Sequence, residues 1–354
     1  MNIEQLRKKI DGVDELILDM LERRASLVKS VGSLKEKTGR DFYVPHREKM
    51  IIARLVSRYN GMLSPEALEG IYREIVNACR ALESRLHIVY FGPEATFTHQ
   101  AALKNFGAGA AYAPAQTIRD VFTEVEKNRA DYGVIPVENS TEGIVNHTLD
   151  MFIESDLSIC TEISMAIELC LLARSGRSED VKRVCSHPQP LGQSRNWLEK
   201  NLPGIPVLEM PSTAEAAKRA AREKGTAAVA SSTAAQLYDL EVVARGIEDT
   251  RENYTRFFVI GKKSAGRSGH DKTSIMFSVK DRVGALHDML MPFKKAKINL
   301  TKIESRPTKK KAWEYIFFID FLGHVSETRI QNALRELGKN CAFLKVLGSY
   351  PKAE

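Results

Sequence analysis

The chain has 354 residues, of which 43% are hydrophobic and 27% are charged. This composition is ordinary for a globular protein, and the length predicts two or three domains. The sequence shows no signal-peptide pattern and no apolar run long enough to cross a bilayer, so we expect no membrane partner. The formal net charge is +7, but no nucleic-acid-binding motif accompanies it. Small anionic substrates explain this charge more simply than a nucleic acid does.

The five cysteines are scattered and form no CxxC pair. An odd number of isolated thiols indicates a reducing cytoplasm and argues against a disulfide framework and a zinc site. The sequence also lacks a glycine-rich phosphate loop, a GxSxG motif and an HExxH motif. We therefore expect a cytoplasmic protein that uses no metal and no cofactor.

A heptad repeat runs through the first 34 residues. Nine of its ten positions are apolar, and these are Ile3, Leu6, Ile10, Val13, Ile17, Met20, Leu27, Val31 and Leu34. The repeat predicts one long helix whose apolar seam packs along a partner helix. The tenth position is Arg24, and a charged guanidinium in a seam is costly unless an anion meets it. The alternative is that Arg24 sets the register or oligomeric state of the helix pair.

Two further cations flank the same seam. Lys35 lies eleven residues after Arg24, which is roughly 16 Å along a helix and close to the same face. These two side chains could hold a molecule with two acidic groups. Arg7 lies roughly 25 Å from Arg24 along the axis, so it could reach that molecule only from an antiparallel partner chain. A shared site of this kind requires a homodimer through the N-terminal helix.

Two shorter helices should follow the long one. The long helix is expected to end near Gly39, the second to run from Pro45 to Gly61, and the third from Pro65 to about Arg85. The proline at the first position of the third helix, after a serine, is a typical helix start. Three helices of such unequal length cannot bury the long seam by themselves, which again favours a dimer.

From residue 87 to about residue 261, strand-like and helix-like segments alternate. This alternation predicts a doubly wound α/β region of two lobes that face a cleft, with ligands at the carboxyl ends of strands. The expected strands are 87–92, 131–137, 165–173, 181–186, 205–210, 227–231 and 256–261. Helices are expected after Thr117 and after Ser212-Thr213.

Polar residues gather where these strands end. The candidates at strand ends are Glu138, Asn139, Ser140, Ser186, Thr255, Arg256 and Phe257, and Gln193 lies a few residues into the helix that follows Ser186. Thr96 lies where the first strand gives way to a helix, whose free N–H groups favour anions. For Thr96, Asn139 and Ser140, an ordinary turn or helix cap is the alternative.

The last part of the chain predicts a small separate domain. Residues 261–272 are polar, basic and glycine-containing, which is typical of a linker. After them we expect a strand (273–279), a helix (283–296), two strands joined by a hairpin around 307–311, a helix (326–338) and a strand (341–347). This βαββαβ order is that of a ferredoxin-like domain.

Taken in order, these segments resemble the family of bifunctional chorismate mutase–prephenate dehydratases. LRKKID, ERRASLVKSVGSLK and HRE, within residues 1–85, are similar to the all-helical class of chorismate mutase. GPEATFTHQAA (92–102), GVIPVENSTEGIVNHTLD (133–150), SHPQPLGQ (186–193), STAEAA (212–217) and NYTRFFVIG (253–261) are similar to prephenate dehydratase. GALH (284–287) and ESRP (304–307) resemble the phenylalanine-binding elements of the regulatory ACT domain.

The resemblance implies that residues 1–86 form a dimeric mutase domain that rearranges chorismate to prephenate without covalent catalysis. Cations must bind both carboxylates, and a donor must meet the ether oxygen that gains charge in the transition state. By motif match, the cations are Arg24, Lys35, Arg47 and, from the other subunit, Arg7. Glu48 matches the acid that holds the substrate hydroxyl.

Three positions of the mutase region depart from the family pattern. Val44 stands where an aspartate is frequent, Cys79 where a small hydroxyl residue is frequent, and Glu83 replaces a glutamine. If Glu83 faces the ether oxygen, only its protonated form can donate the hydrogen bond. The alternative is that Glu83 points to solvent.

Residues 87–262 should form the dehydratase domain, which converts prephenate to phenylpyruvate with loss of water and carbon dioxide. The resemblance gives the essential role to Thr255 and implies that Asn139, Ser186, Gln193, Ser212 and Thr213 line the cleft. The proton donor remains open between Glu138 and Thr255. Ala95 stands where the family frequently has glycine, so the backbone conformation at this position need not follow the family pattern.

Residues 273–350 should form the ACT domain, which binds phenylalanine and inhibits the dehydratase. The matching residues are Gly284, Ala285, Leu286, His287, Glu304, Ser305, Arg306 and Pro307. The alternative for the whole chain is a non-catalytic, ligand-sensing dimeric regulator with an amino-acid-binding domain.

Overall fold

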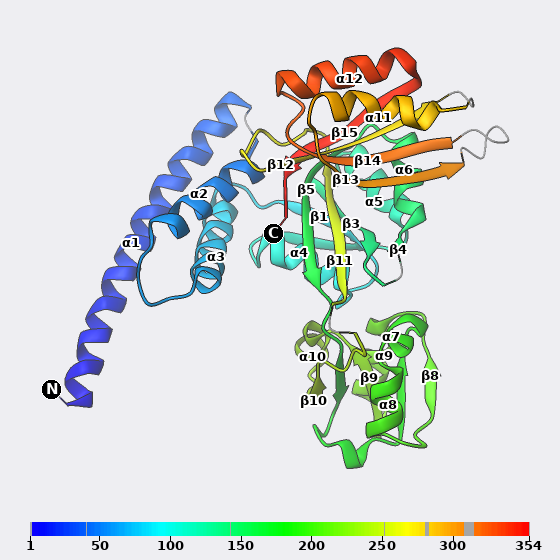
Figure 1. The fold of residues 1–354 in the computed structure, drawn as a ribbon. Helices are drawn as coiled ribbons and strands as arrows, with labels where there is room; N and C mark the ends of the chain where they lie inside the picture. The colour runs from blue at the N-terminus through cyan, green and yellow to red at the C-terminus, as the bar shows by residue number, and fades with distance from the viewer. Residues whose placement is uncertain are drawn as a thin grey trace.

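The computed structural model describes residues 2–39, 41–141, 143–250, 252–279, 283–307 and 315–353. Figure 1 shows a helical region beside a two-lobed α/β body, with a smaller α/β domain at one end of that body. The lysine run at 309–311, expected in a hairpin turn, lies outside the described residues.

The first region consists of three helices: α1 (Ile3–Thr38), α2 (Pro45–Arg58) and α3 (Pro65–Glu83). All three predicted helices are confirmed. The Asn2 side chain caps α1, and Gly39 ends it in a left-handed conformation with φ of 62°. Ser64 caps α3, where its side chain accepts a hydrogen bond from the Ala67 N–H. These caps satisfy backbone groups that would otherwise have no partner at the helix ends.

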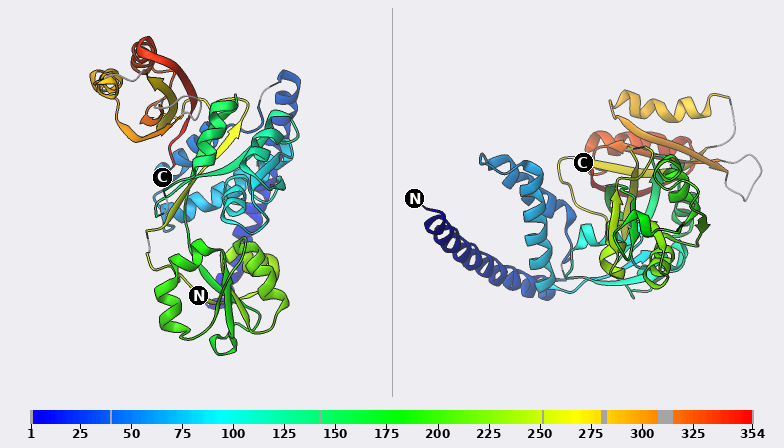
Figure 2. Two further views of the ribbon diagram at one scale, coloured as in Figure 1. Left: turned by 90° about the vertical axis from the view of Figure 1, so that its right-hand side faces the viewer. Right: turned by 90° about the horizontal axis from the view of Figure 1, so that it is seen from below.

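Helix α1 projects from the rest of the molecule (Figures 1 and 2). All nine apolar residues of the predicted seam are exposed, with between 42% and 69% of their surface accessible. The stripe that instead packs toward α3 contains Leu21, Arg24, Ala25, Val28 and Lys35 as half-buried residues, with Gly32 buried. The seam therefore has no partner within the described part of this chain.

The first lobe of the α/β body is built on a sheet in the order β2-β1-β3-β11-β5, with β4 paired to β3. Its strands are β1 (His87–Phe91), β2 (Ala111–Ala115), β3 (Tyr132–Asn139), β4 (Gly143–Ile144), β5 (Ser158–Ala166) and β11 (Tyr254–Gly261). Its helices are α4 (Phe97–Phe106), α5 (Ile118–Glu126) and α6 (Asn146–Glu154). Strand β11 returns from the second lobe and runs antiparallel to both neighbours, so the sheet is mixed.

The second lobe has a sheet in the order β10-β6-β9-β7-β8. Its strands are β6 (Cys170–Ala173), β7 (Arg183–Ser186), β8 (Val207–Glu209), β9 (Thr226–Ala230) and β10 (Glu241–Arg245). Its helices are the short 3-10 turn η1 (Ser178–Asp180), α7 (Pro188–Gln193), α8 (Arg195–Asn201), α9 (Thr213–Arg222) and α10 (Ser232–Tyr238). Figure 1 shows this lobe joined to the first by narrow connections.

One predicted strand was wrong in its extent. Residues 165–173 do not form a single strand, because β5 ends at Ala166 and β6 begins at Cys170. The three residues between them carry the chain from one lobe to the other. They are hydrogen-bonded to the returning connection, from Ile167 N to Asn253 O (2.8 Å) and from Ile247 N to Leu169 O (3.0 Å). The apolar sequence is the same for one long buried strand as for two buried strands joined by a short connection between lobes, so it cannot distinguish them.

The C-terminal domain has the predicted βαββαβ order: β12 (Asp271–Val279), α11 (Ala285–Lys295), β13 (Leu300–Pro307), β14 (Tyr315–Leu322), α12 (Thr328–Asn340) and β15 (Cys341–Pro351). The sheet order is β13-β14-β12-β15. A Cβ atom at Gly348 of β15 would lie 2.3 Å from the Ile159 carbonyl oxygen of β5. Glycine therefore permits the close approach of the C-terminal sheet to the first lobe.

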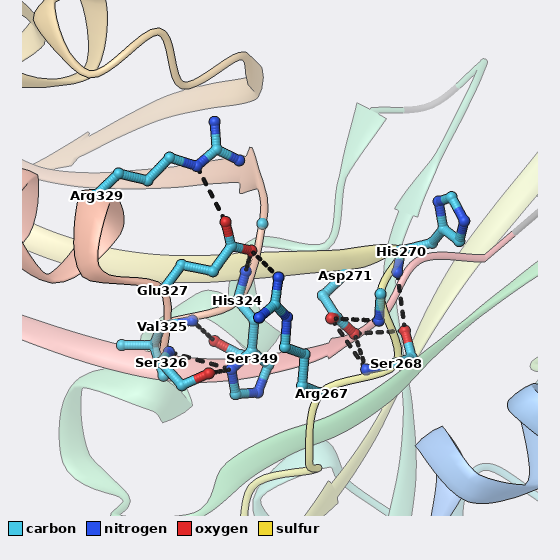
Figure 3. Close-up of polar contacts among 12 residues, drawn as sticks. Arg267, Ser268, His270, Asp271, His324, Val325, Ser326, Glu327, Arg329 and Ser349 are labelled. Carbon is cyan, nitrogen blue, oxygen red and sulfur yellow. Dashed lines mark hydrogen bonds and ion pairs between the residues drawn. The ribbon is translucent and has the colours of Figure 1, made fainter.

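The expected linker is held in place by polar contacts at both sides. The Gly266 N–H donates to Nδ1 of His46 in α2 (3.0 Å), and Lys263 pairs with Asp41. Figure 3 shows the C-terminal side, where Asp271 accepts hydrogen bonds from Ser268 and Gly269. These contacts join the segment to the helical region and to the C-terminal domain at once.

Candidate active sites and effector site

The helical region brings Lys35 of α1 and Glu83 of α3 together. The Lys35 ammonium lies 2.5 Å from a Glu83 carboxylate oxygen, and the side chains are only 19% and 10% exposed. Gly32 permits this contact, because a Cβ atom there would lie 3.0 Å from the Glu83 Cα. Glu83 therefore faces the site and not the solvent, so the alternative of an outward Glu83 is wrong.

The other predicted mutase residues lie around this pair in different environments. Arg24 is half-buried, with Nη1 3.5 Å from the Ile75 carbonyl oxygen of α3, and Cys79 is buried on α3. Arg47 is exposed at the start of α2. Arg7 is exposed near the far end of α1, and the described chain does not bring it to the site.

Glu48 of α2 is held by a residue that the sequence analysis missed. Arg80 of α3 donates to both Glu48 carboxylate oxygens, at 2.8 and 2.9 Å. Burial raises the pKa of Glu48, and the positive charges of Arg80 and Lys35 oppose that rise. Nothing in the sequence distinguishes Arg80 from other charged residues on a helix, because its burial depends on a second domain.

In the cleft region, Asn139 and Thr255 lie directly opposite each other on β3 and β11. Asn139 Nδ2 donates to Thr255 Oγ1 and to Asn253 Oδ1, both at 2.8 Å. Gln193 of the second lobe completes the network by donating to Thr141 Oγ1 (3.0 Å) and accepting from Asn253 Nδ2 (3.2 Å). Sequence analysis predicted Asn139, Gln193 and Thr255, and it missed Thr141 and Asn253.

The network fixes the direction of the Thr255 hydroxyl. Asn139 Oδ1 accepts the backbone N–H of Thr141 (3.0 Å), which can only donate, so the opposite end of the amide is the NH₂ group. That NH₂ group donates to Thr255 Oγ1. The Thr255 oxygen is therefore an acceptor toward Asn139, and its own proton is available for a different partner.

Other predicted cleft residues have local structural partners. Ser212 and Thr96 cap α9 and α4, and their side chains accept backbone N–H groups. Ser186 is fully buried and donates to the Val229 carbonyl oxygen (2.6 Å), and Thr213 is also buried. Ser140 Oγ donates to the Glu252 carbonyl oxygen (3.0 Å) at the returning connection.

Ala95 adopts a positive φ of 67°, a conformation in which glycine is the usual residue. Its carbonyl oxygen accepts a hydrogen bond from Ser231 Oγ of the second lobe (3.1 Å). The glycine-like backbone is therefore kept although the side chain is present.

Glu138 and Arg256 point away from the Asn139–Thr255 pair. They are paired in register on β3 and β11, one residue from Asn139 and Thr255, and neighbouring residues on a strand point to opposite faces. Glu138 lies 2.6 Å from Lys302 of β13, and Arg256 lies 2.5 Å from Asp320 of β14.

The structure thus directs Arg256 to the C-terminal domain and not to the cleft, contrary to the expectation for a substrate contact. It also directs Glu138 away from Thr255 and toward Lys302 of the C-terminal domain. Phe257 is 1% exposed and belongs to the hydrophobic core.

The two predicted effector motifs lie at the same end of the C-terminal sheet. Ser278, near the end of β12, pairs with Ile316, which in turn pairs with Arg306. Of the first motif, Gly284, Leu286 and His287 are exposed and Ala285 is buried; of the second, Ser305 and Pro307 are exposed and Glu304 is half-buried. Arg306 is buried and donates to the backbone and side-chain oxygens of Asn146 in α6.

Within the described ranges, no group of three or more His, Cys, Asp or Glu side chains is arranged to hold a metal ion. No helix among the described residues is both long enough and apolar enough to cross a membrane. The five cysteines are free thiols, and burial raises the pKa of Cys160 to about 12.

The fold and these sites define a multidomain enzyme with a helical domain, a two-lobed α/β domain and a regulatory βαββαβ domain. Three family models match in this order: chorismate mutase type II over residues 6–84, prephenate dehydratase over 88–265 and the ACT domain over 273–339. The ferredoxin-like domain is therefore an ACT domain.

Similar proteins extend this match to nearly the whole chain. The bifunctional chorismate mutase/prephenate dehydratase of Aquifex aeolicus is 53% identical over 99% of this chain and 98% of that protein. The protein of the same name from Pseudomonas aeruginosa is 42% identical over 99% and 98%. The crystal structure of prephenate dehydratase from Arthrobacter aurescens in complex with L-Phe is 32% identical, with a TM-score of 0.70 over 75% of this chain and 90% of that one.

The chain belongs to the bifunctional chorismate mutase/prephenate dehydratase family. It is an enzyme with two catalytic domains, so the alternative of a non-catalytic regulator is wrong.

Proposed function

We propose that the helical domain converts chorismate to prephenate at the site around Lys35 and Glu83, and that the cleft around Thr255 converts prephenate to phenylpyruvate. The observation that carries this proposal is the presence of two separate polar sites in two domains. One pairs a lysine with a carboxyl group, and in the other the Thr255 oxygen accepts a hydrogen bond from Asn139, which leaves the Thr255 proton available for a substrate.

In the mutase step, Arg24, Lys35 and Arg47 would bind the substrate carboxylates, and Glu48 would hold the substrate hydroxyl. Cys79 would line the site, and Glu83 would meet the ether oxygen. In the free protein Lys35 is paired with Glu83. Binding would therefore exchange Glu83 for a substrate carboxylate at Lys35, and this exchange would free the Glu83 carboxyl group to face the ether oxygen, to which only a protonated carboxyl group can donate.

The mutase site would be completed in a homodimer. The nine exposed seam residues of α1 are the apolar surface that a second copy of the helix would cover. An antiparallel second copy would also bring its Arg7 toward Arg24. This arrangement accounts for an exposed Arg7 that lies far along α1 from the other site residues.

In the dehydratase step, Thr255 would protonate the leaving ring hydroxyl while Asn139 holds the Thr255 oxygen. Aromatisation supplies the driving force, so orientation of the substrate is the main task of the protein. Asn253, Thr141 and Gln193 would contribute by bridging the lobes. Thr96, Ser140, Ser186, Ser212 and Thr213 would shape the cleft chiefly through the local contacts described above.

The direct test supplies purified protein with chorismate and measures prephenate and phenylpyruvate over time. Transient prephenate followed by phenylpyruvate is expected. Supplying prephenate alone should give phenylpyruvate without a lag. Absence of phenylpyruvate in both reactions would contradict the proposal.

Phenylalanine would bind near the two exposed motifs of the ACT domain and inhibit the dehydratase. Glu138 and Arg256 support a physical connection, since each is paired with the ACT domain and each adjoins a cleft residue on the same strand. A movement of the ACT sheet would therefore act on the strands that carry Asn139 and Thr255. Inhibition requires that the effector bind one state of this arrangement more tightly than the other.

Lys302→Met tests this connection by removing the cation that faces Glu138. Calorimetry should find phenylalanine bound as in the wild type, while inhibition of dehydratase weakens about fivefold or more. Lys295→Met is the matched control, because Lys295 pairs with Glu336 inside the ACT domain. Undiminished inhibition in Lys302→Met would contradict the connection, and lack of phenylalanine binding by the wild type would contradict the effector assignment.

We also infer a cytoplasmic location, which the scattered free thiols and the biosynthetic role support.

A further inference from the structure

Arg80 stands at the contact between the helical domain and the dehydratase domain. It is 5% exposed, although arginine is rarely buried without partners. Its Nη1 atom binds both carboxylate oxygens of Glu48, and its Nη2 atom donates to Asn77 Oδ1 (3.0 Å) and to the Phe106 carbonyl oxygen (2.8 Å). The guanidinium therefore binds two domains at the same time.

The dehydratase side of this contact is the C-terminal end of α4. Phe106 is the last residue of α4, and its carbonyl is one of the groups that a helix end leaves without an intrahelical partner. The guanidinium also lies over two aromatic rings, 5.1 Å from the centre of Tyr43 and 5.5 Å from that of Phe106. Tyr43 is in turn bonded to Asn105 of α4 (2.9 Å). The guanidinium thus lies between Tyr43 of the helical domain and Phe106 of the dehydratase domain.

The mutase side of this contact is Glu48. Its side chain is half-buried, and the loss of solvent around it raises its pKa. The charged groups that face it are Arg80 and Glu83 from α3 and Lys35 from α1, and the Tyr43 hydroxyl lies on the segment before α2. Arg80 is the cation that binds both oxygens of Glu48, and it opposes the rise that burial causes in the pKa of this carboxyl group.

We propose that Arg80 is a positioning residue for the mutase reaction, which makes the geometry of the mutase site depend on the docked dehydratase domain. The inference rests on the proposed role of Glu48 in binding the substrate hydroxyl. Arg80 itself acts through Glu48 and does not touch the substrate. The dehydratase domain thereby serves a second purpose as part of the scaffold of the mutase site.

The test compares Arg80→Met, Arg80→Lys and Glu48→Gln in the full chain. Methionine keeps much of the apolar stem and removes the charge and the hydrogen bonds. Mutase kcat/KM at neutral pH should fall about ten- to hundredfold, the loss expected for a charge-assisted hydrogen bond in a buried site. The acid limb of the mutase pH profile should move to higher pH, because Glu48 ionises less easily without this cation.

Arg80→Lys separates the effect of the positive charge from the effect of orienting the Glu48 side chain. The lysine ammonium keeps the positive charge, but it cannot donate to Glu48 and to the Phe106 carbonyl oxygen with the planar geometry of a guanidinium. The acid limb should therefore stay near its wild-type position while kcat/KM is still reduced severalfold. This variant also decides the matter if Arg80→Met does not fold.

Arg73→Met is the matched control. Arg73 is on the same helix two turns earlier, and it pairs with Glu69 within that helix. Its mutase activity and pH profile should match the wild type. Dehydratase activity on supplied prephenate should stay within about twofold of wild type in all the Arg80 variants.

The outcomes distinguish this inference from the proposed function. A wild type without mutase activity would refute the proposed function, and an unimpaired Glu48→Gln would refute the role of Glu48. If both hold but folded Arg80 variants retain full mutase activity and the wild-type profile, the inference about Arg80 is wrong. It is equally wrong if mutase and dehydratase fall in parallel with unchanged pH limbs, since that result indicates a general structural role.

Discussion

The helical region and the dehydratase cleft differ in how far one chain completes them. In the cleft, Asn139, Thr255, Asn253 and Gln193 form a connected network within the chain. In the helical region, the nine seam residues of α1 remain exposed and Arg7 remains far from the other cations. The comparison teaches that two activities on one chain can have different requirements: one chain already joins the residues proposed for the dehydratase step, whereas we propose that the mutase site is completed by a second copy.

Thr255→Ala should give the largest separation of the two regions. Removal of the hydroxyl whose oxygen is bound by Asn139 should lower dehydratase kcat by about a hundred- to ten-thousandfold, the range for a lost proton donor. Mutase activity should not change, because Thr255 lies in the other domain. Assays with chorismate and with prephenate measure the two steps separately, and near-normal phenylpyruvate formation would refute the assignment.

Glu83→Gln should have a smaller, pH-dependent effect on the mutase alone. A protonated Glu83 can donate to the ether oxygen and an ionised one cannot, so wild-type mutase activity should fall as pH rises. Glutamine donates at every pH and should flatten that fall, with a severalfold advantage over wild type at the alkaline end. Identical pH profiles for the two proteins would remove Glu83 from the site.

The smallest effect is expected at the boundary between the regions, where His46 accepts the Gly266 N–H. Burial lowers the pKa of His46 below its usual 6.5. Between that lowered pKa and 6.5 the unfolded chain binds a proton that the folded chain does not, so stability rises with pH through this window and is complete above it.

In the His46→Asn variant, the asparagine oxygen can still accept the Gly266 N–H, but the side chain has no proton to gain as the pH falls. Urea unfolding at several pH values should therefore show that His46→Asn loses less stability than wild type as the pH falls below about 6.5. Equal losses in the two proteins would exclude His46 as a source of the pH dependence.

The sequence predicted most of what depends on local patterns. The heptad repeat, the Ser64-Pro65 start and the βαββαβ order led to the correct helices and to the correct C-terminal fold. Asn139, Gln193 and Thr255 were predicted from family motifs near the ends of strands, and the structure joins them in one hydrogen-bonded network.

What the sequence could not provide are features that arise between distant segments. Residues 165–173 are divided between two strands because the chain passes from one lobe to the other within them. The residues before and after this passage are equally apolar, so the sequence does not mark it. Arg80 reads as a surface arginine until the dehydratase domain covers it, and Asn253 belongs to a connection with no regular structure. Arg256 was assigned to the cleft because it adjoins Thr255, yet the alternation of side chains along a strand turns it toward the ACT domain.

The central claim is that the mutase site is shared between two copies while the dehydratase cleft is not. Arg7→Ala and Arg24→Ala each remove one cation, so either variant alone should lose mutase activity on the order of a thousandfold and keep full dehydratase activity on supplied prephenate. The two variants are then unfolded, mixed in equal amounts and refolded. Half of the dimers should be mixed, and one of the two sites in each should be intact, so mutase activity should return to about one quarter of the wild type. No recovery after verified subunit exchange, or equal activity of the separate variants and the mixture, would contradict the shared site.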